Sequence, residues 1–281
     1  MIIFFESGRL GNQLFQYSAL KTVAKDERLF LVGFDDIRAV FDGLEACFPA
    51  PRGSAMYQIC QRLRPAANRR LPMSRLVGIV RENSAPGGIA VDASSGLINR
   101  IKYAPTAYFQ SEQAFDPAAI SGLMMKDQLI NRAKALIDEV CHANQQPIFV
   151  HVRRRDYLEF PSRENPAVLP ATWYRRRLDE FRSEYSNPIF LFLTDDLHYA
   201  HDVFGETLDG HILDTDPPTA LATMSLCEGG ILSASSFAWW GAYFARQRSH
   251  EGLFTAPLHW VGHRTGEWHP PFIESSFLKY A

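Results

Sequence analysis

A run of three arginines between a histidine and an aspartate is the most chemically suggestive part of the chain. The segment His151-Val152-Arg153-Arg154-Arg155-Asp156-Tyr157 directly follows the apolar residues 148–150. Alternate side chains of a strand point to opposite faces, so His151 and Arg153 are expected on one face. Guanidiniums held at a strand end suit a phosphate or diphosphate, because each presents a rigid fork of N–H donors. The alternative is a basic surface patch neutralised by Asp156 and Glu159.

Two further polar segments could bind a phosphate or a sugar. Ser235-Ser236-Phe237 precedes an apolar stretch that predicts a helix. One hydroxyl is expected to cap this helix, and the free N–H groups of a helix start attract phosphates. Gly8-Arg9-Leu10-Gly11-Asn12-Gln13 follows the apolar residues 2–5 and supplies two amide side chains. It lacks both the third glycine of a dinucleotide fingerprint and the Gly-Lys-Ser/Thr of a P-loop, which argues against an NAD enzyme and an ATPase.

Two acidic segments leave alternatives open. Thr194-Asp195-Asp196 predicts a helix N-cap, and a carboxylate there could also bind guanine N–H groups or ribose hydroxyls. Asp214-Thr215-Asp216 could hold a divalent metal on a nucleotide diphosphate, but Pro217-Pro218 indicates a loop and the arginines already supply positive charge. His259 and His263 are four residues apart without an evident third ligand. We therefore predict no metal and no cofactor.

Strands that alternate with helices must position these segments. Residues 2–5 predict a strand that leads to a helix reaching Ala24, and three later strands are expected at 148–152, 189–193 and 230–233. This alternation implies a mostly parallel sheet, with the polar segments at the carboxyl ends of its strands, where open α/β sheets bind ligands. The polar residues 142–147 suggest a boundary, so we predict domains at 1–145 and 146–265 and a C-terminal tail at 266–281.

Composition narrows the class of protein. The chain has 281 residues, 46% of them hydrophobic and 21% charged, which is typical of a globular protein. A formal charge of −2 gives no reason to expect nucleic-acid binding. The four cysteines form no C-x-x-C pair, and the first apolar run stops at Phe5. We therefore expect a cytoplasmic protein without a signal peptide or membrane anchor.

The segment from 47 to 81 is strongly basic. It contains seven arginines and no acidic residue. Met56, Ile59, Cys60 and Leu63 have helical spacing, and Pro65 and Pro72 are expected to end that helix. One interpretation is a solvated basic surface. The other is contact with anionic lipid at the inner face of the cytoplasmic membrane through Arg62, Arg64, Arg69 and Arg70.

Several segments together resemble one known family. GRLGNQLFQYSAL, HVRRRDY, FLTDD and SSFAWWGAYF occur in the order seen in the α-1,2-fucosyltransferases of glycosyltransferase family 11, and TAPLHW is similar to a late family element. The resemblance spans nearly the whole chain. It implies an α/β, GT-B-like fold, in which two Rossmann-like domains face each other across a cleft. It also implies metal-independent, inverting transfer of fucose from GDP-β-L-fucose to the 2-hydroxyl of a galactoside, in an oligosaccharide or a lipid-linked glycan.

The resemblance also implies roles for particular residues. His151 would approach the guanosine, Arg153 the diphosphate, and Arg154 would fix the loop. Asn12, beside Gly11, would reach the diphosphate or the fucose, which makes Arg153 and Asn12 the expected catalytic residues. The expected donor-binding set is Gly11, Asn12, His151, Arg153, Arg154, Asp195, Ser235, Ser236 and the backbone of Phe237.

One departure from the family pattern concerns the base. Relatives often carry an acidic residue before a Met-Ser-x-Cys element, where it contacts guanine, but here the matching region reads Thr219-Ala220-Leu221. The nearest carboxylates are Asp214 and Asp216, and no general base is assigned. Transfer from another GDP-sugar, or nucleotide binding without turnover, are the alternatives.

Overall fold

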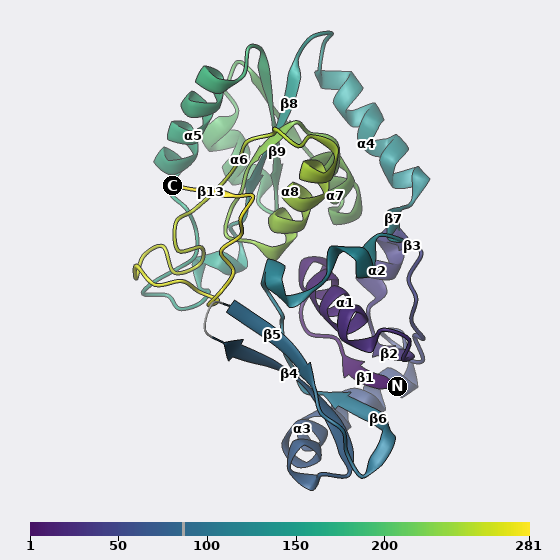
Figure 1. Ribbon diagram of the computed structural model, residues 1–281. Helices are drawn as coiled ribbons and strands as arrows, with labels where there is room; N and C mark the ends of the chain where they lie inside the picture. Colours follow the sequence, from purple (N-terminus) through teal and green to yellow (C-terminus); the bar gives the residue numbers. More distant parts are fainter. Residues whose placement is uncertain (86–87) are drawn as a thin grey trace. The chain divides into compact units, whose positions relative to one another are not determined.

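The computed structural model describes residues 1–85 and 88–281, which form two compact units, Met1–Met125 and Lys126–Ala281 (Figure 1). This division falls before helix α4 (Asp127–Val140), whereas the sequence placed the boundary after it, near 145. The reason is packing, because α4 buries Leu129 and Ala133 and lies against helix α7 (Pro217–Leu226) of the second unit. Residues 266–281 are not a separate tail, since strand β13 (Lys279–Tyr280) pairs with β12 (Phe254–Ala256).

The first unit is built on a five-stranded sheet. Its spatial order is β2 (Leu29–Val32), β1 (Ile2–Phe5), β6 (Ile98–Ala104), β4 (Val77–Ala85) and β5 (Gly88–Ala93). All neighbouring strands are parallel except β4 and β5, which form an antiparallel pair. Helix α1 (Leu10–Ala24) follows β1, so the predicted strand and helix are confirmed. The helix begins at Leu10, which places Asn12 and Gln13 in its first turn.

Shorter elements complete the first unit. They are α2 (Asp35–Val40), two single-turn helices, η1 (Glu112–Ala114) and η2 (Pro117–Ile120), and the two-stranded pair β3 (Phe41–Asp42) and β7 (Met124–Met125). The predicted basic helix is α3 (Ala55–Ser74), and it continues through both Pro65 and Pro72. The expectation that these prolines end the helix is wrong. Because α3 buries none of its residues, carbonyl groups freed by the missing proline N–H can be solvated.

The second unit is a six-stranded parallel sheet with helices on both faces. Its strands lie in the order β10 (Gly210–Leu213), β9 (Pro188–Thr194), β8 (Gln146–Val152), β11 (Gly229–Ile231), β12 and β13. Helices α5 (Ala171–Glu184) and α6 (Leu197–Phe204) cover one face, and α7 and α8 (Ser236–Arg248) cover the other (Figure 1). The predicted mostly parallel sheet is therefore confirmed.

The order of these strands fixes where a ligand can bind. Strands β8, β9 and β10 follow one another across the sheet toward one edge. The chain then crosses back, so that β11 lies on the other side of β8. Open α/β sheets bind ligands at such a reversal, which here falls at the carboxyl ends of β8 and β11.

Apolar side chains pack on both faces of this sheet. Ile148, Phe149 and Val150 are fully buried in β8, as is typical of a central parallel strand. Trp239 and Trp240 of α8 are fully buried as well, so they belong to the core, as expected. Gly241 allows close packing, but against Met224 of α7 and not against the sheet: a Cβ at Gly241 would lie 2.8 Å from the Met224 side chain.

Candidate functional site

His151 lies in the second unit where the strand order reverses. It occupies the carboxyl end of β8, is almost fully buried, and shares a 2.7 Å hydrogen bond between its Nδ1 and the Ser233 hydroxyl, which follows β11. The ring centroid is 5.6 Å from that of Phe237 at the start of α8. Burial, with the nearby charge of Arg153, lowers the pKa of His151 to about 3. The imidazole is therefore neutral at physiological pH and a weak base, which suits it to hydrogen bonding.

Arg153 follows His151 by two residues and is held by two carboxylates. Its Nη2 donates to Asp156 at 2.8 Å, and its Nη1 lies 3.2 Å from a carboxylate oxygen of Asp195, at the end of β9. The guanidinium also lies 5.6 Å from the centroid of the Tyr157 ring. These contacts orient the side chain in advance and occupy only part of its five N–H donors.

Arg154 holds the loop in place. Its backbone N–H donates to Asp195 at 2.8 Å, its Nε lies 3.3 Å from Asp196, and its guanidinium stacks 3.9 Å above the centroid of the Tyr199 ring. Asp196 also caps α6 by accepting from the Tyr199 N–H, as expected for the Asp195-Asp196 pair. This geometry agrees with a positioning role for Arg154.

The charge of the cluster differs from the sequence-based picture. Arg153 and Arg154 contact three aspartates, 156, 195 and 196, and with the exposed Arg155 counted as well the formal charges add to zero. The alternative of a patch neutralised by Asp156 is thus partly correct. A bound anion gains directional N–H donors here but less net positive charge than the run of arginines suggests.

The start of α8 lies beside this cluster. Ser235 is the N-cap, and its hydroxyl accepts from the Phe237 N–H at 3.3 Å; Ser236 is the first helical residue. Tyr157 donates its hydroxyl hydrogen to the Ala234 carbonyl at 2.7 Å. This bond and the one between His151 and Ser233 tie the loop after β8 to the loop after β11.

The structure thus brings together seven of the nine predicted donor-binding residues in the second unit, namely His151, Arg153, Arg154, Asp195, Ser235, Ser236 and Phe237. Sequence reasoning missed Ser233 and the Tyr157 hydroxyl. Ser233 stands at the end of the predicted strand 230–233, so its proximity to His151 follows only once the two strands are known to be neighbours.

Gly11 and Asn12 belong to the first unit. The Asn12 carbonyl oxygen accepts from Gln110 at 2.6 Å, which orients the amide. Gly8 precedes it with a positive φ of 85°, and a Cβ there would lie 2.2 Å from the Asn12 amide nitrogen, so only glycine fits this turn. The roles of Gly11 and Asn12 toward the donor remain predictions.

Glu6, at the end of β1, is a buried carboxylate that sequence reasoning did not single out. It accepts hydrogen bonds from the Phe34 N–H and from the side chains of Gln13, Arg52 and Tyr57. The only sequence signal was a single acidic residue directly after an apolar strand. With its oxygens occupied in this way, Glu6 serves to fix the glycine turn and the start of α3.

Arg64 corrects the prediction of four lipid-contacting arginines. Its Nη1 donates to the Glu6 backbone carbonyl at 2.9 Å, and its Nη2 donates to Thr106 at 3.0 Å. The guanidinium therefore points into the first unit, and Arg64 is a structural residue.

Asp214 and Asp216 line a hollow of about 430 Å³ with Arg132 and Glu139. Asp216 caps α7 by accepting from the Thr219 N–H at 2.9 Å, and Arg132 pairs with it at 2.9 Å. Within residues 1–85 and 88–281, no three His, Cys, Asp or Glu side chains form a group that could hold a metal ion.

A parallel sheet with arginine side chains and a helix N-terminus at its reversal point is typical of glycosyltransferases of the GT-B fold, and comparison with known proteins supports that class. The structure resembles the fucosyltransferase NodZ from Bradyrhizobium, with a TM-score of 0.52 and 14% identity over 85% of this chain and 91% of NodZ. It also resembles POFUT1 in complex with GDP-fucose, with a TM-score of 0.54 and 13% identity over 90% of this chain and 97% of POFUT1. The fold is GT-B, as predicted.

The chain belongs to glycosyl transferase family 11, whose family model matches residues 94–254. It is 22% identical to the O-antigen biosynthesis glycosyltransferase WbnK of Escherichia coli, over 90% of this chain and 93% of WbnK. It is 25% identical over 138 residues to the galactoside alpha-(1,2)-fucosyltransferase 2 of Mus musculus, which covers 46% of this chain and 40% of the mouse enzyme. The chain thus matches nearly all of WbnK and less than half of the mouse protein.

Proposed function

We propose that this glycosyltransferase transfers L-fucose from GDP-β-L-fucose to the 2-hydroxyl of a galactoside, with inversion to an α-1,2-fucoside. Family membership supports the reaction class, and the relatives named as galactoside alpha-(1,2)-fucosyltransferases support the linkage. The observation that carries the proposal is the meeting of Arg153 and the α8 N-terminus at the point where the strand order reverses.

The proposed chemistry is stabilisation of the leaving group. As the bond between fucose C1 and the diphosphate breaks, negative charge grows on the phosphate oxygens. Preorganised Arg153 donors and the first N–H groups of α8 would meet this charge without reorganising at the moment of reaction. The Phe237 N–H would exchange its long cap bond to Ser235 for a phosphate oxygen.

His151 has a separate proposed role in holding the nucleoside. Its Nδ1 is bonded to Ser233, and no described residue hydrogen-bonds its Nε2. A neutral imidazole fixed in this way offers one hydrogen-bonding atom to the guanosine. We propose that neither His151 nor Glu6 is the base. Burial lowers the pKa of His151 to about 3, so its imidazole accepts a proton poorly, and the Glu6 oxygens already accept four hydrogen bonds. The bond between C1 and the diphosphate breaks and GDP leaves with its electron pair. The acceptor oxygen bonds to the oxocarbenium-like C1 from the opposite face, and the hydroxyl proton passes to solvent water.

The test is turnover of defined donors. GDP release from GDP-fucose should rise when a galactose-terminated oligosaccharide or a lipid-linked glycan with terminal galactose is added. Mass spectrometry and NMR of the product should show one added deoxyhexose in α-1,2 linkage. Turnover of GDP-mannose in place of GDP-fucose would refute the assignment of GDP-fucose as the donor. GDP binding without turnover across the acceptor panel would identify a nucleotide-binding protein.

A further inference from the structure

Helix α3 presents its polar side chains to its own unit. Tyr57 donates to Glu6 at 3.0 Å, Arg64 bonds to the Glu6 carbonyl, and Asn68 donates to Thr106 at 2.8 Å and accepts from Tyr103 at 2.6 Å. Residues 57, 61, 64 and 68 recur at helical spacing and so share one face. This polar face is the one packed on the protein.

The opposite face of α3 is apolar and exposed. Met56 is 54% exposed, Ile59 50%, Leu63 60% and Met73 80%, and none of the 20 residues of α3 is buried. A surface helix ordinarily turns its apolar residues to the core and its polar residues to water. In α3 this arrangement is reversed, which indicates that something apolar meets the outer face.

The same face is strongly basic. Arg62, Arg69 and Arg70 are exposed, and no carboxylate among the described residues pairs with any of them. No acidic residue occurs from 46 to 81. Two exposed arginines of the second unit differ in this respect, since Arg163 pairs with Glu159 and Arg182 with Asp179 and Asp209.

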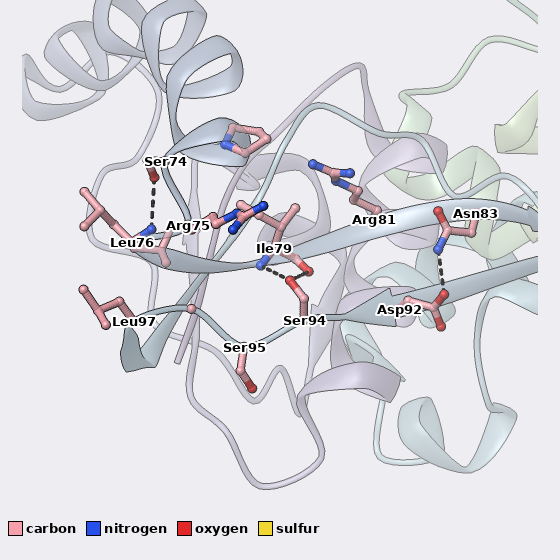
Figure 2. Close-up of a pocket in the computed structure, with 13 residues that line it drawn as sticks. Ser74, Arg75, Leu76, Ile79, Arg81, Asn83, Asp92, Ser94, Ser95 and Leu97 are labelled. Carbon is pink, nitrogen blue, oxygen red and sulfur yellow. Dashed lines mark hydrogen bonds between the residues drawn. The ribbon is translucent and has the colours of Figure 1, made fainter.

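The exposed apolar surface continues past the end of the helix. Leu76, 48% exposed, and Leu97, 83% exposed, lie side by side at one end of a hollow of about 680 Å³ (Figure 2). Backbone bonds from the Leu97 N–H to Arg75 and from the Ile98 N–H to Leu76 fix this pairing. Arg75 lies beside Leu76 and adds a cationic group there, while Arg81 and Asp92 line the hollow farther from the leucines (Figure 2).

We propose that the outer face of α3, with Leu76 and Leu97, docks on the surface of an anionic lipid bilayer. Apolar side chains would enter the interface while the arginines extend to the phosphates. Charge complementarity favours anionic lipid, because the outer face of α3 carries exposed arginines and no acidic residue occurs from 46 to 81. A protein partner is less well matched, since this face carries no aromatic residue and intersperses its apolar residues with unpaired arginines, whereas interface cores are rich in aromatic residues and poor in charge.

Flotation with liposomes tests the proposal on the full chain. The chain should bind vesicles of equal parts phosphatidylcholine and phosphatidylglycerol, bind pure phosphatidylcholine weakly, and dissociate in high salt. Each arginine should raise the partition coefficient onto the vesicle about fivefold. The triple change Arg62→Gln, Arg69→Gln and Arg70→Gln should therefore weaken binding on the order of a hundredfold. Leu63→Ser should weaken it about tenfold.

Matched controls separate docking from nonspecific charge. Arg28, Arg176 and Arg264 are exposed without a described partner, so changing all three to Gln removes the same charge elsewhere. Leu208, fully exposed, is the control for Leu63, through Leu208→Ser. Circular dichroism melting curves should match for all variants.

The expected result is loss of lipid binding in the α3 variants alone. The proposal is overturned if the wild-type chain does not float with anionic vesicles, or if the α3 triple variant and the control triple variant bind equally. Concentration-dependent self-association in sedimentation velocity, abolished by Leu63→Ser, would instead assign this face to a second copy of the chain.

Discussion

Replacing Arg153 with alanine should lower kcat by more than the loss of a single hydrogen-bond donor would. Loss of a single preorganised donor lowers kcat on the order of 10²–10³-fold. Arg153→Ala also frees Asp195, which now lies 3.2 Å from the guanidinium with its side chain 19% exposed. A phosphate oxygen on the far side of the guanidinium would be about 6 Å from that carboxylate, where two unit charges repel by roughly 3 kcal/mol at an effective dielectric constant of about 20. Solvent screening reduces this repulsion, so we expect it to lower kcat by about a further tenfold.

The assay is GDP release at saturating acceptor, with kcat and KM determined separately. Adding Asp195→Asn to Arg153→Ala should restore about tenfold, because it removes the uncompensated charge. Arg153→Lys should rescue poorly, since an ammonium keeps the charge but loses the planar fork. Arg155→Ala, an exposed neighbour without a described partner, is the matched control and should retain activity. Near wild-type turnover by a well-folded Arg153→Ala protein would refute the phosphate role. A double variant no faster than the single one would refute the charge argument.

Three further predictions follow from the two units. Because Arg153 and α8 are proposed to supply the donors, activity should survive excess EDTA; loss on chelation that Mn²⁺ restores would redirect attention to Asp214 and Asp216. His151 has a folded pKa of about 3, so the unfolded state binds the extra proton between about pH 6.5 and 3, and stability falls as the pH drops through this window. Between about pH 8 and pH 5 the loss should be about 2 kcal/mol by denaturant titration, and His151→Gln should flatten the slope. Glu6→Gln should lower the stability of the first unit by about 2 kcal/mol, seen as a calorimetric transition at lower temperature, because it removes the charge of a buried carboxylate that pairs with the partly exposed Arg52; an unchanged transition would contradict that network.

The sequence predicted the local elements of the site well. The strand before His151, the cap at Ser235 and the cap at Asp196 follow from short-range rules of periodicity and capping, and the structure confirms all three. Placing the polar segments at the carboxyl ends of parallel strands was sufficient to predict that they converge.

Long-range pairing was beyond such rules. Nothing local indicates that Asp195 rather than Glu159 would hold Arg153, or that Ser233 would meet His151, because both depend on strand order. The domain boundary was misplaced because α4 looks like the end of one unit by its position in the chain, and only its packing on α7 assigns it to the next. The inward orientation of Arg64 depends likewise on a partner, Glu6, that lies 58 residues away.

The crossing of the chain from β10 back to β11 has a consequence for how the second unit folds. His151 and Ser233 are 82 residues apart, and closing a flexible loop of that length costs about 4 kcal/mol of chain entropy. Strands β8, β9 and β10 are closer together in the chain and can pair first. The contact between the ends of β8 and β11 is therefore expected to form late in folding. A nucleotide that binds only the sheet with this contact formed would stabilise the folded second unit. At a concentration roughly 100 times its dissociation constant, it would add about 2.7 kcal/mol to the free energy of unfolding.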